Sequence, residues 1–286
     1  MNQYNELIAA STSSYTNYSL PVALEHIAKI GYKQVEIAAI VNLAEHVRQE
    51  DLTEKQANKV RNLLNQNGLK TTALSAHLPL SQKDAVTKFK LRMDFAKSIG
   101  ASIANTNAGP VSQMASFIKN MEELVSYAEE IKIMIGLETH GDIINHGKSA
   151  VQAIKQFASK QVILNYDFAN VFTNSFGKVD PADDFNNIAD LIGHMHIKDI
   201  IKRNNFYYMC TIGEGLINYN KILNIVKQLH KSIPITIEIP LCLELNKNAK
   251  AKVIDKIIKL DLVDEVLENS LKYVRKNLFK NSIKNQ

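Results

Sequence analysis

The chain has 286 residues, of which 45% are hydrophobic and 22% charged, and its net charge is +5. This composition is typical of a globular protein with a sizeable core, and it excludes a largely disordered chain. The two cysteines, Cys210 and Cys242, are too few for a disulfide framework. We therefore expect a reducing, cytoplasmic location. No stretch approaches the roughly 18 apolar residues of a membrane span, and the polar start lacks signal-peptide features, so neither membrane insertion nor secretion is expected.

The lysines are spread along the chain, with local clusters in residues 246–259 and 272–284. Few aromatic residues that could stack on bases lie between them. The pattern favours a solvated basic surface over a nucleic-acid interface, and no nucleic-acid partner is expected.

Apolar, β-branched runs of strand length recur at a spacing of roughly 30 residues. In chain order, the predicted strands are Leu7–Ser11, Gln34–Ala39, Thr71–Leu78, Ser102–Asn107, Ile133–His140, Val162–Phe168, Ile192–Asp199 and Ile235–Leu241. None alternates strongly, which is typical of parallel strands that are buried on both faces.

The segments between these strands carry apolar residues at helical spacing. The predicted helices are Leu20–Ile30, Leu52–Asn67, Asp84–Ile99, Met114–Lys132, Lys148–Ala158, Pro181–Leu191, Tyr219–Lys231 and Leu262–Leu278. Glycines 31, 68 and 100 stand where left-handed helix caps are expected. The order predicts a single (β/α)8 TIM barrel domain over residues 1–286, with a longer connection at 243–261 and a basic, poorly ordered tail at 276–286.

Acidic residues interrupt three of the later apolar strands. Glu138, Asp167 and Glu238 each stand near a strand's carboxyl end, where the functional groups of a βα barrel gather. An ionised carboxylate among aliphatic residues is costly to bury unless a cation or hydrogen-bond donors meet it. Three such residues, on the fifth, sixth and eighth predicted strands, therefore indicate a shared cation site.

The seventh predicted strand carries two histidines, His194 and His196. Both have the same parity and can face the barrel interior, and we favour His196 as a ligand because it lies nearer the carboxyl end. Taken singly, each of the four polar residues could be a buried polar group whose hydrogen bonds or ion pairs are satisfied within the core. Together, Glu138, Asp167, His196 and Glu238 predict a divalent-metal site.

A ligand set rich in carboxylates suits a hard or borderline ion. We expect Mn²⁺ first, with Co²⁺, Mg²⁺ or Zn²⁺ as alternatives. Such an ion polarises a carbonyl and stabilises the enediolate formed when the neighbouring carbon loses a proton. Glu138 and Glu238 are the expected acid and base of that proton transfer.

The ordered set of motifs around these ligands resembles the xylose isomerase-like barrel superfamily, and within it the sugar phosphate isomerase/epimerase group of ketose 3-epimerases and hydroxypyruvate isomerase. The motifs are Leu137–His140, Tyr166–Asn170, His194–Asp199, Gly213–Gly215 and Ile237–Ile239. The resemblance implies a metal-dependent isomerase or epimerase of a sugar or sugar phosphate, acting through a cis-enediolate with Glu138 and Glu238 as the proton-transfer pair. Asn170 stands where many members carry histidine, and Lys202 where the epimerases carry arginine.

Further strand-end residues are candidate contacts for a small sugar or polyol. They are Glu36, His77, His140, Asn170, Lys198 and Lys202. For Glu36 and His77 the alternative is a structural hydrogen bond, and for Lys198 an ion pair with Asp199. Gly213-Glu214-Gly215 lacks the longer glycine pattern of a phosphate loop and is interpreted as a loop that shapes the barrel mouth.

Three other functions fit parts of the pattern. A keto-polyol dehydratase would use the same metal and enolate chemistry but expel water. An apurinic endonuclease would need a multi-metal cluster, for which His26, His46, His146 and His230 fall on helices or loops. A non-catalytic sugar-binding protein is the last alternative, and a homodimer is one option for the assembly.

Overall fold

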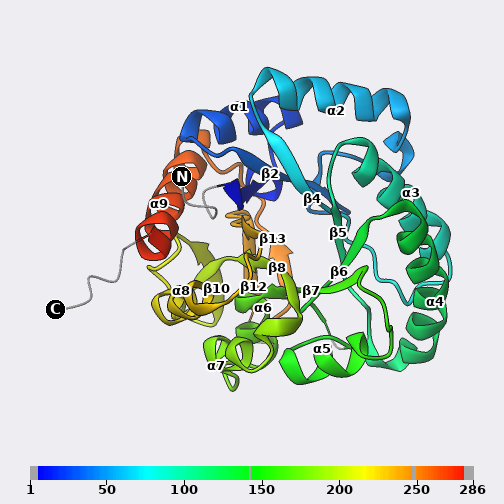
Figure 1. Cartoon of the computed structure of the whole chain (residues 1–286). Helices are drawn as coiled ribbons and strands as arrows, with labels where there is room; N and C mark the ends of the chain where they lie inside the picture. The colour runs from blue at the N-terminus through cyan, green and yellow to red at the C-terminus, as the bar shows by residue number, and fades with distance from the viewer. Residues whose placement is uncertain (1–5, 142, 247–248, 280–286) are drawn as a thin grey trace.

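The computed structural model describes residues 6–141, 143–246 and 249–279. Eight parallel strands close into a barrel, and helices surround it as an outer ring (Figure 1). The barrel strands are β1 (Ile8–Ser11), β2 (Gln34–Ile40), β4 (Lys70–Ser75), β5 (Ile103–Thr106), β6 (Met134–Glu138), β7 (Val162–Asp167), β8 (Ile192–Ile197) and β11 (Ile235–Ile237). Strand β1 pairs with both β11 and β2 and so completes the closure. The predicted (β/α)8 barrel is confirmed.

The outer helices bury one apolar face against the strands, as their amphipathic patterns predict. They are α1 (Leu20–Ile30), α2 (Glu54–Gln66), α3 (Ala85–Ser98), α4 (Met114–Ile131), α5 (Gly147–Ile154), α6 (Phe168–Asn174), α7 (Pro181–Asn186), α8 (Tyr219–Gln228) and α9 (Leu260–Phe279). Short 3-10 turns lie at Thr12–Tyr15, Gln49–Asp51, Val111–Gln113 and Ala189–Leu191. None of the described helices is long and apolar enough to cross a bilayer.

The last described helix, α9, lies against the first elements of the described chain. Helix α9 packs beside α1 (Figure 1), and the Tyr32 hydroxyl donates to the Leu267 carbonyl over 2.9 Å. Asp264 of α9 accepts from the Tyr15 hydroxyl at 2.7 Å and lies 2.6 Å from His26 of α1. Residues 276–279 of the segment predicted as a basic, poorly ordered tail belong to α9, and residues 280–286 lie outside the described part.

A second sheet, absent from the sequence prediction, stands at the carboxyl end of the barrel. It is antiparallel and has the order β13-β12-β10-β9, with β9 (Asp199–Arg203), β10 (Phe206–Cys210), β12 (Leu243–Asn246) and β13 (Ala251–Val253). The connection expected at 243–261 thus contains two strands. A two-residue strand, β3 (Ala44–Glu45), pairs with β2.

Asp199 fixes the loop that leads out of this sheet. Its carboxylate accepts backbone N–H groups from residues 200, 213, 215 and 217 over 2.9–3.1 Å. A Cβ on Gly215 would come within 2.2 Å of Asp199 Oδ1, so glycine is required there for the close approach. The Asp199 carboxylate therefore holds the Gly213–Gly215 motif in place. The ion pair between Lys198 and Asp199, which the sequence left open as an alternative, is not formed, because Lys198 pairs with Asp167 and Glu238.

Candidate metal centre and substrate pocket

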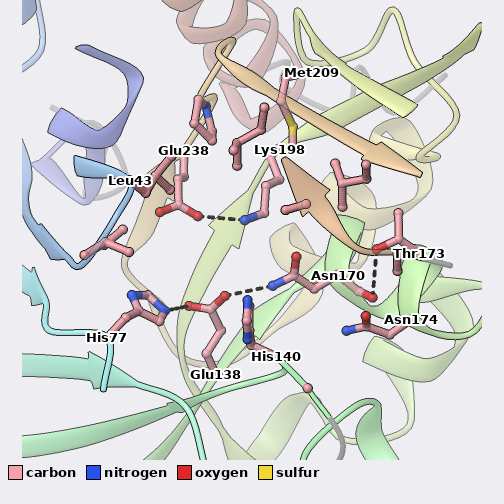
Figure 2. Close-up of a pocket in the computed structure, with 17 residues that line it drawn as sticks. Leu43, His77, Glu138, His140, Asn170, Thr173, Asn174, Lys198, Met209 and Glu238 are labelled. Atoms are coloured by element: carbon pink, nitrogen blue, oxygen red, sulfur yellow. Dashed lines mark hydrogen bonds and ion pairs between the residues drawn. The ribbon is translucent and has the colours of Figure 1, made fainter. Parts of the chain in front are cut away.

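A pocket opens at the carboxyl end of the barrel, between the strand ends and the second sheet (Figure 2). Its barrel side is polar, and its upper wall is apolar. The polar lining residues are His77, Glu138, His140, Asn170, Thr173, Asn174, Lys198 and Glu238. The apolar wall includes Met209 of β10 and Leu243 and Leu245 of β12, so the second sheet contributes directly to the pocket.

The four predicted metal ligands meet at the floor of this pocket. Glu138 ends β6, Asp167 ends β7, His196 lies in β8 and Glu238 follows β11. One donor atom from each lies within 4.8 Å of the others, and all four side chains are buried. The parallel strands therefore bring together the ligand set that the sequence predicts.

Glu138 is held by donors on both of its oxygens. Its Oε2 lies 2.7 Å from His77 Nε2, and its Oε1 accepts from Asn170 Nδ2 over 2.8 Å (Figure 2). Burial alone would raise the pKa of Glu138, but His77 and His196 hold it well below its usual value. Glu138 is therefore ionised and able to accept a proton or bind a cation.

The other two carboxylates share one cation. Lys198 Nζ lies 2.7 Å from Asp167 Oδ2 and 2.8 Å from Glu238 Oε2. Burial and the nearby glutamates raise the pKa of Asp167 to about 6 despite Lys198. Burial also acts to raise the pKa of Glu238, but Lys198 and His196 bring it below its usual value. The Oδ1 atom of Asp167 accepts the Asn170 N–H and thereby starts α6, a helix that the sequence reading missed.

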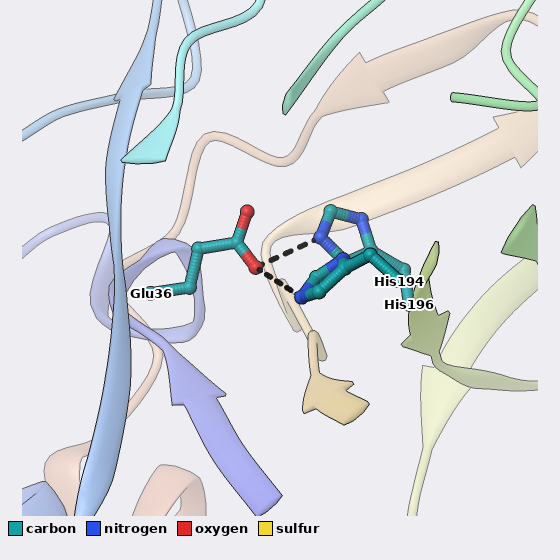
Figure 3. Close-up of side chains that lie close together, drawn as sticks. All are labelled: Glu36, His194 and His196. Atoms are coloured by element: carbon teal, nitrogen blue, oxygen red, sulfur yellow. Dashed lines mark hydrogen bonds and ion pairs between the residues drawn. The ribbon is translucent and has the colours of Figure 1, made fainter. Parts of the chain in front are cut away.

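His196 presents its two ring nitrogens to different groups. Nδ1 lies 3.2 Å from Glu138 Oε2 and 3.4 Å from Glu238 Oε2, whereas Nε2 lies 2.9 Å from Glu36 Oε2. Figure 3 shows Glu36 facing both strand β8 histidines. A proton on Nε2 donated to Glu36 leaves the Nδ1 lone pair for a cation, the arrangement that orients metal-binding histidines in proteins.

His194, the other histidine of β8, lies in a polar layer inside the barrel. Its Nδ1 is 2.9 Å from Asn165 Oδ1, and burial lowers its pKa to about 4. Asn105 joins the same layer by donating to Glu36 over 2.8 Å. A Cβ on Gly136 would come within 2.0 Å of Asn105 Oδ1, so this strand glycine makes room for the layer.

The six candidate substrate contacts divide into two groups. His77, His140, Asn170 and Lys198 line the pocket. Glu36 is fully buried beneath it, and Lys202 lies exposed on β9 with its Nζ 5.7 Å from the Tyr207 ring centre. The apolar wall was not predicted from the sequence, because the strands that form it pair across distant segments of the chain. The run of β-favouring residues at Phe206–Cys210 could have indicated one of these strands.

The donor set fits a divalent cation. Three carboxylates and one imidazole supply hard and borderline donors from four strand ends. Within the described residues, Asp167 Oδ2 is buried without a hydrogen-bond partner, since Lys198 contacts it as an ion pair. A buried carboxylate oxygen that is met by a cation, here the Lys198 ammonium, is also one that a divalent ion can bind.

Comparison with known proteins identifies one family. The family model described as xylose isomerase-like TIM barrel matches residues 24–255. A comparison with curated proteins found no match.

Solved structures share the fold along nearly the whole chain. A D-psicose 3-epimerase from Clostridium cellulolyticum H10 is 14% identical with a TM-score of 0.72, covering 95% of this chain and 99% of that one. A magnesium-bound xylose isomerase-like TIM barrel protein from Mycobacterium smegmatis is 17% identical with a TM-score of 0.71, covering 95% and 97%. The probable 3-DHS dehydratase AsbF from Bacillus anthracis is 16% identical with a TM-score of 0.68, covering 93% and 98%. At these identities the likeness shows the fold alone.

Proposed function

Because the chain belongs to the xylose isomerase-like TIM barrel family, we propose that it is a divalent-metal-dependent isomerase or epimerase of a small sugar, sugar phosphate or polyol. One observation carries the proposal: Glu138 and Glu238 belong to the four-ligand cluster and also line the pocket. A buried metal site of purely structural character would have no need of two carboxylates open to a ligand.

The two glutamates are placed for proton transfer at a carbon next to a carbonyl. Strands β6 and β11 are separated in the barrel by β7 and β8, so Glu138 and Glu238 approach the pocket from different sides (Figure 2). One glutamate, in its ionised form, removes the proton to give a cis-enediolate, and the other, in its protonated form, returns a proton to the opposite face, so that the two exchange protonation states in a turnover. Burial favours the protonated form that the acid partner needs, whereas the neighbouring His77, His196 and Lys198 lower the pKa values and favour the ionised form that acts as the base.

The reaction places negative charge on the substrate oxygens, which requires positive charge nearby. A divalent ion bound by Glu138, Asp167, His196 and Glu238 would supply that charge as a Lewis acid. We propose Mn²⁺ as this ion, with Co²⁺, Mg²⁺ and Zn²⁺ as alternatives, because carboxylates dominate the donor set.

The pocket residues suggest how the substrate is held. His77, His140, Asn170 and Lys198 supply hydrogen-bonding groups for hydroxyl and carbonyl oxygens. Glu36 and Lys202 are not proposed as contacts because neither lines the pocket. The two free cysteines, Cys210 and Cys242, support a cytoplasmic location. The proposal includes a small-molecule substrate and no nucleic-acid partner, and a homodimer is one option for the assembly.

A dehydratase acting on a keto-polyol is the second candidate. It would need one base and a donor that protonates the departing hydroxyl, and Glu238 beside Lys198 supplies both kinds of group at 2.8 Å. The likeness to a probable 3-DHS dehydratase favours keeping this option. An apurinic endonuclease is not proposed, because the second cluster, Glu36, His194 and His196, is buried and shares His196 with the first.

Product analysis tests the proposal. The purified protein with added Mn²⁺ is incubated with a panel of ketoses and ketose phosphates, and products are identified by NMR and mass spectrometry. We expect an epimer or aldose of unchanged mass, and its loss in Glu138→Gln and Glu238→Gln. Lys221→Met, at the exposed Lys221–Asp183 pair, is the matched control that keeps activity. A product lighter by one water would replace the isomerase proposal with the dehydratase.

A further inference from the structure

Lys198 is the buried cation of the candidate metal centre. Its side chain is 9% exposed, and no other lysine among the described residues is buried. The ammonium contacts two of the four ligand residues, Asp167 at 2.7 Å and Glu238 at 2.8 Å, and the side chain also lines the pocket (Figure 2). Lys198 therefore stands between the ligand cluster and the substrate space.

The oxygens that Lys198 contacts are also the ones that remain for a metal ion. Asp167 Oδ1 already accepts the Asn170 N–H, which leaves Oδ2 for a cation. Glu238 Oε1 accepts from Ser13 Oγ over 3.4 Å, and Oε2 faces both Lys198 and His196 Nδ1. An ammonium has three donors and no acceptor, so it uses carboxylate lone pairs in the same way as a metal ion.

We propose that the Lys198 ammonium competes with the divalent ion for Asp167 and Glu238, and that ion binding turns this side chain into the pocket to meet a substrate oxygen. The inference rests on the proposed function, because it assigns Lys198 a place in the same metal site. It makes Lys198 a competitor for the metal ligands before ion binding and a substrate contact afterwards.

Electrostatics gives the reason for the exchange. Two cations sharing the same carboxylate oxygens in a buried site repel each other, since water cannot screen them there. The divalent ion has twice the charge of the ammonium and gains four ligands, whereas Lys198 has two acidic partners. The flexible four-carbon stem of lysine lets the ammonium move without backbone rearrangement.

If Lys198 instead supported metal binding, its removal would change the metal affinity in the opposite direction. If its ammonium holds Asp167 and Glu238 in place for the metal, removing the charge would weaken metal binding. If it competes, removing the charge would strengthen metal binding and, because the substrate contact is lost, weaken activity. A gain in metal affinity together with a loss of activity is not expected from a merely structural lysine.

Calorimetric titration of Mn²⁺ into chelator-treated protein is the test. We expect Lys198→Met, close to lysine in shape but neutral, to bind Mn²⁺ at least about tenfold more tightly than the wild type. The control is Lys221→Met, which removes an exposed lysine paired with Asp183 and should leave the dissociation constant within about twofold. An equal or weaker affinity in folded Lys198→Met would overturn the inference.

A second measurement uses the unaltered protein and does not depend on the variant folding. Amine acetylation is followed by mass spectrometry at Lys198 with and without Mn²⁺, with Lys221 as internal reference. Faster labelling of Lys198 with Mn²⁺ is expected, because the freed amine enters the pocket; unchanged or slower labelling would overturn the inference.

These experiments separate the inference from the proposed function. Wild-type protein that binds one Mn²⁺, combined with no affinity gain in Lys198→Met, overturns the inference alone. Failure of both proteins to bind any of Mn²⁺, Co²⁺, Mg²⁺ and Zn²⁺ overturns the inference and the proposed function together. A gain in Mn²⁺ affinity in Lys198→Met, combined with a wild-type protein that has no isomerase or epimerase activity, supports the competition and overturns the proposed function.

Discussion

His196 Nε2 lies 2.9 Å from Glu36 Oε2, although the two residues are 160 positions apart in the chain. The other oxygen of Glu36 accepts from Asn105, so both carboxylate oxygens are engaged. Burial would raise the pKa of Glu36, but His196 and His194 lower it to about 2, which keeps it ionised. Glu36 thus favours the histidine tautomer with its proton on Nε2, which leaves the Nδ1 lone pair facing Glu138 and Glu238.

Replacing Glu36 by glutamine should weaken metal binding although the shape is nearly unchanged. The amide can face His196 with a donor, which moves the imidazole proton to Nδ1 and removes the lone pair required by the metal. We expect about 10-fold to 100-fold weaker Mn²⁺ binding by calorimetry, the usual effect of losing such a partner. Glu123→Gln, at an exposed pair with Lys90, should change nothing. Wild-type affinity in folded Glu36→Gln would rule out this role.

Metal affinity should depend steeply on pH. Burial would lower the pKa of His196, but Glu36, Glu238 and Glu138 hold it well above its usual range, so ion binding at Nδ1 must expel a proton near neutral pH. Affinity should therefore rise about tenfold per pH unit between about 6 and 8. Below the Asp167 pKa of about 6, a second proton competes and the dependence steepens. Calorimetry in buffers of different ionisation enthalpy counts these protons, and equal affinity at both ends of the range would refute the prediction.

The Asp199 carboxylate should contribute strongly to stability. Asparagine would place an amide nitrogen against backbone N–H groups that now donate to a charged oxygen. We expect Asp199→Asn to lower the free energy of unfolding by about 2–4 kcal/mol, measured by urea denaturation. Asp255→Asn, at an exposed position, should stay within about 0.5 kcal/mol. Equal losses in the two variants would show that the Asp199 contacts are not responsible.

The sequence predicted the barrel and the grouping of its four ligands because both depend on local patterns. A carboxylate inside an apolar strand is visible in the sequence, and strand ends of a parallel barrel meet by topology. The second sheet was missed because β10 and β12 pair across more than thirty intervening residues. Such pairing is decided by tertiary contacts rather than by local propensity.

The roles of individual polar side chains could be assigned only from distances in the three-dimensional structure. Glu36 was expected at the substrate, yet it lies beneath the metal ligands because strand β2 reaches the barrel interior at that level. Lys198 was expected at a substrate oxygen or Asp199, and its two carboxylate partners come from β7 and from the segment after β11. No sequence spacing encodes these pairs.

Metal content tests the central claim most directly. Wild-type protein purified without chelators, Glu138→Gln and His196→Ala are compared by elemental analysis, with circular dichroism to confirm folding. The four-ligand site predicts one divalent ion per wild-type chain and a marked loss in both variants. Equal metal content in all three folded proteins, including none in any of them, would contradict the account.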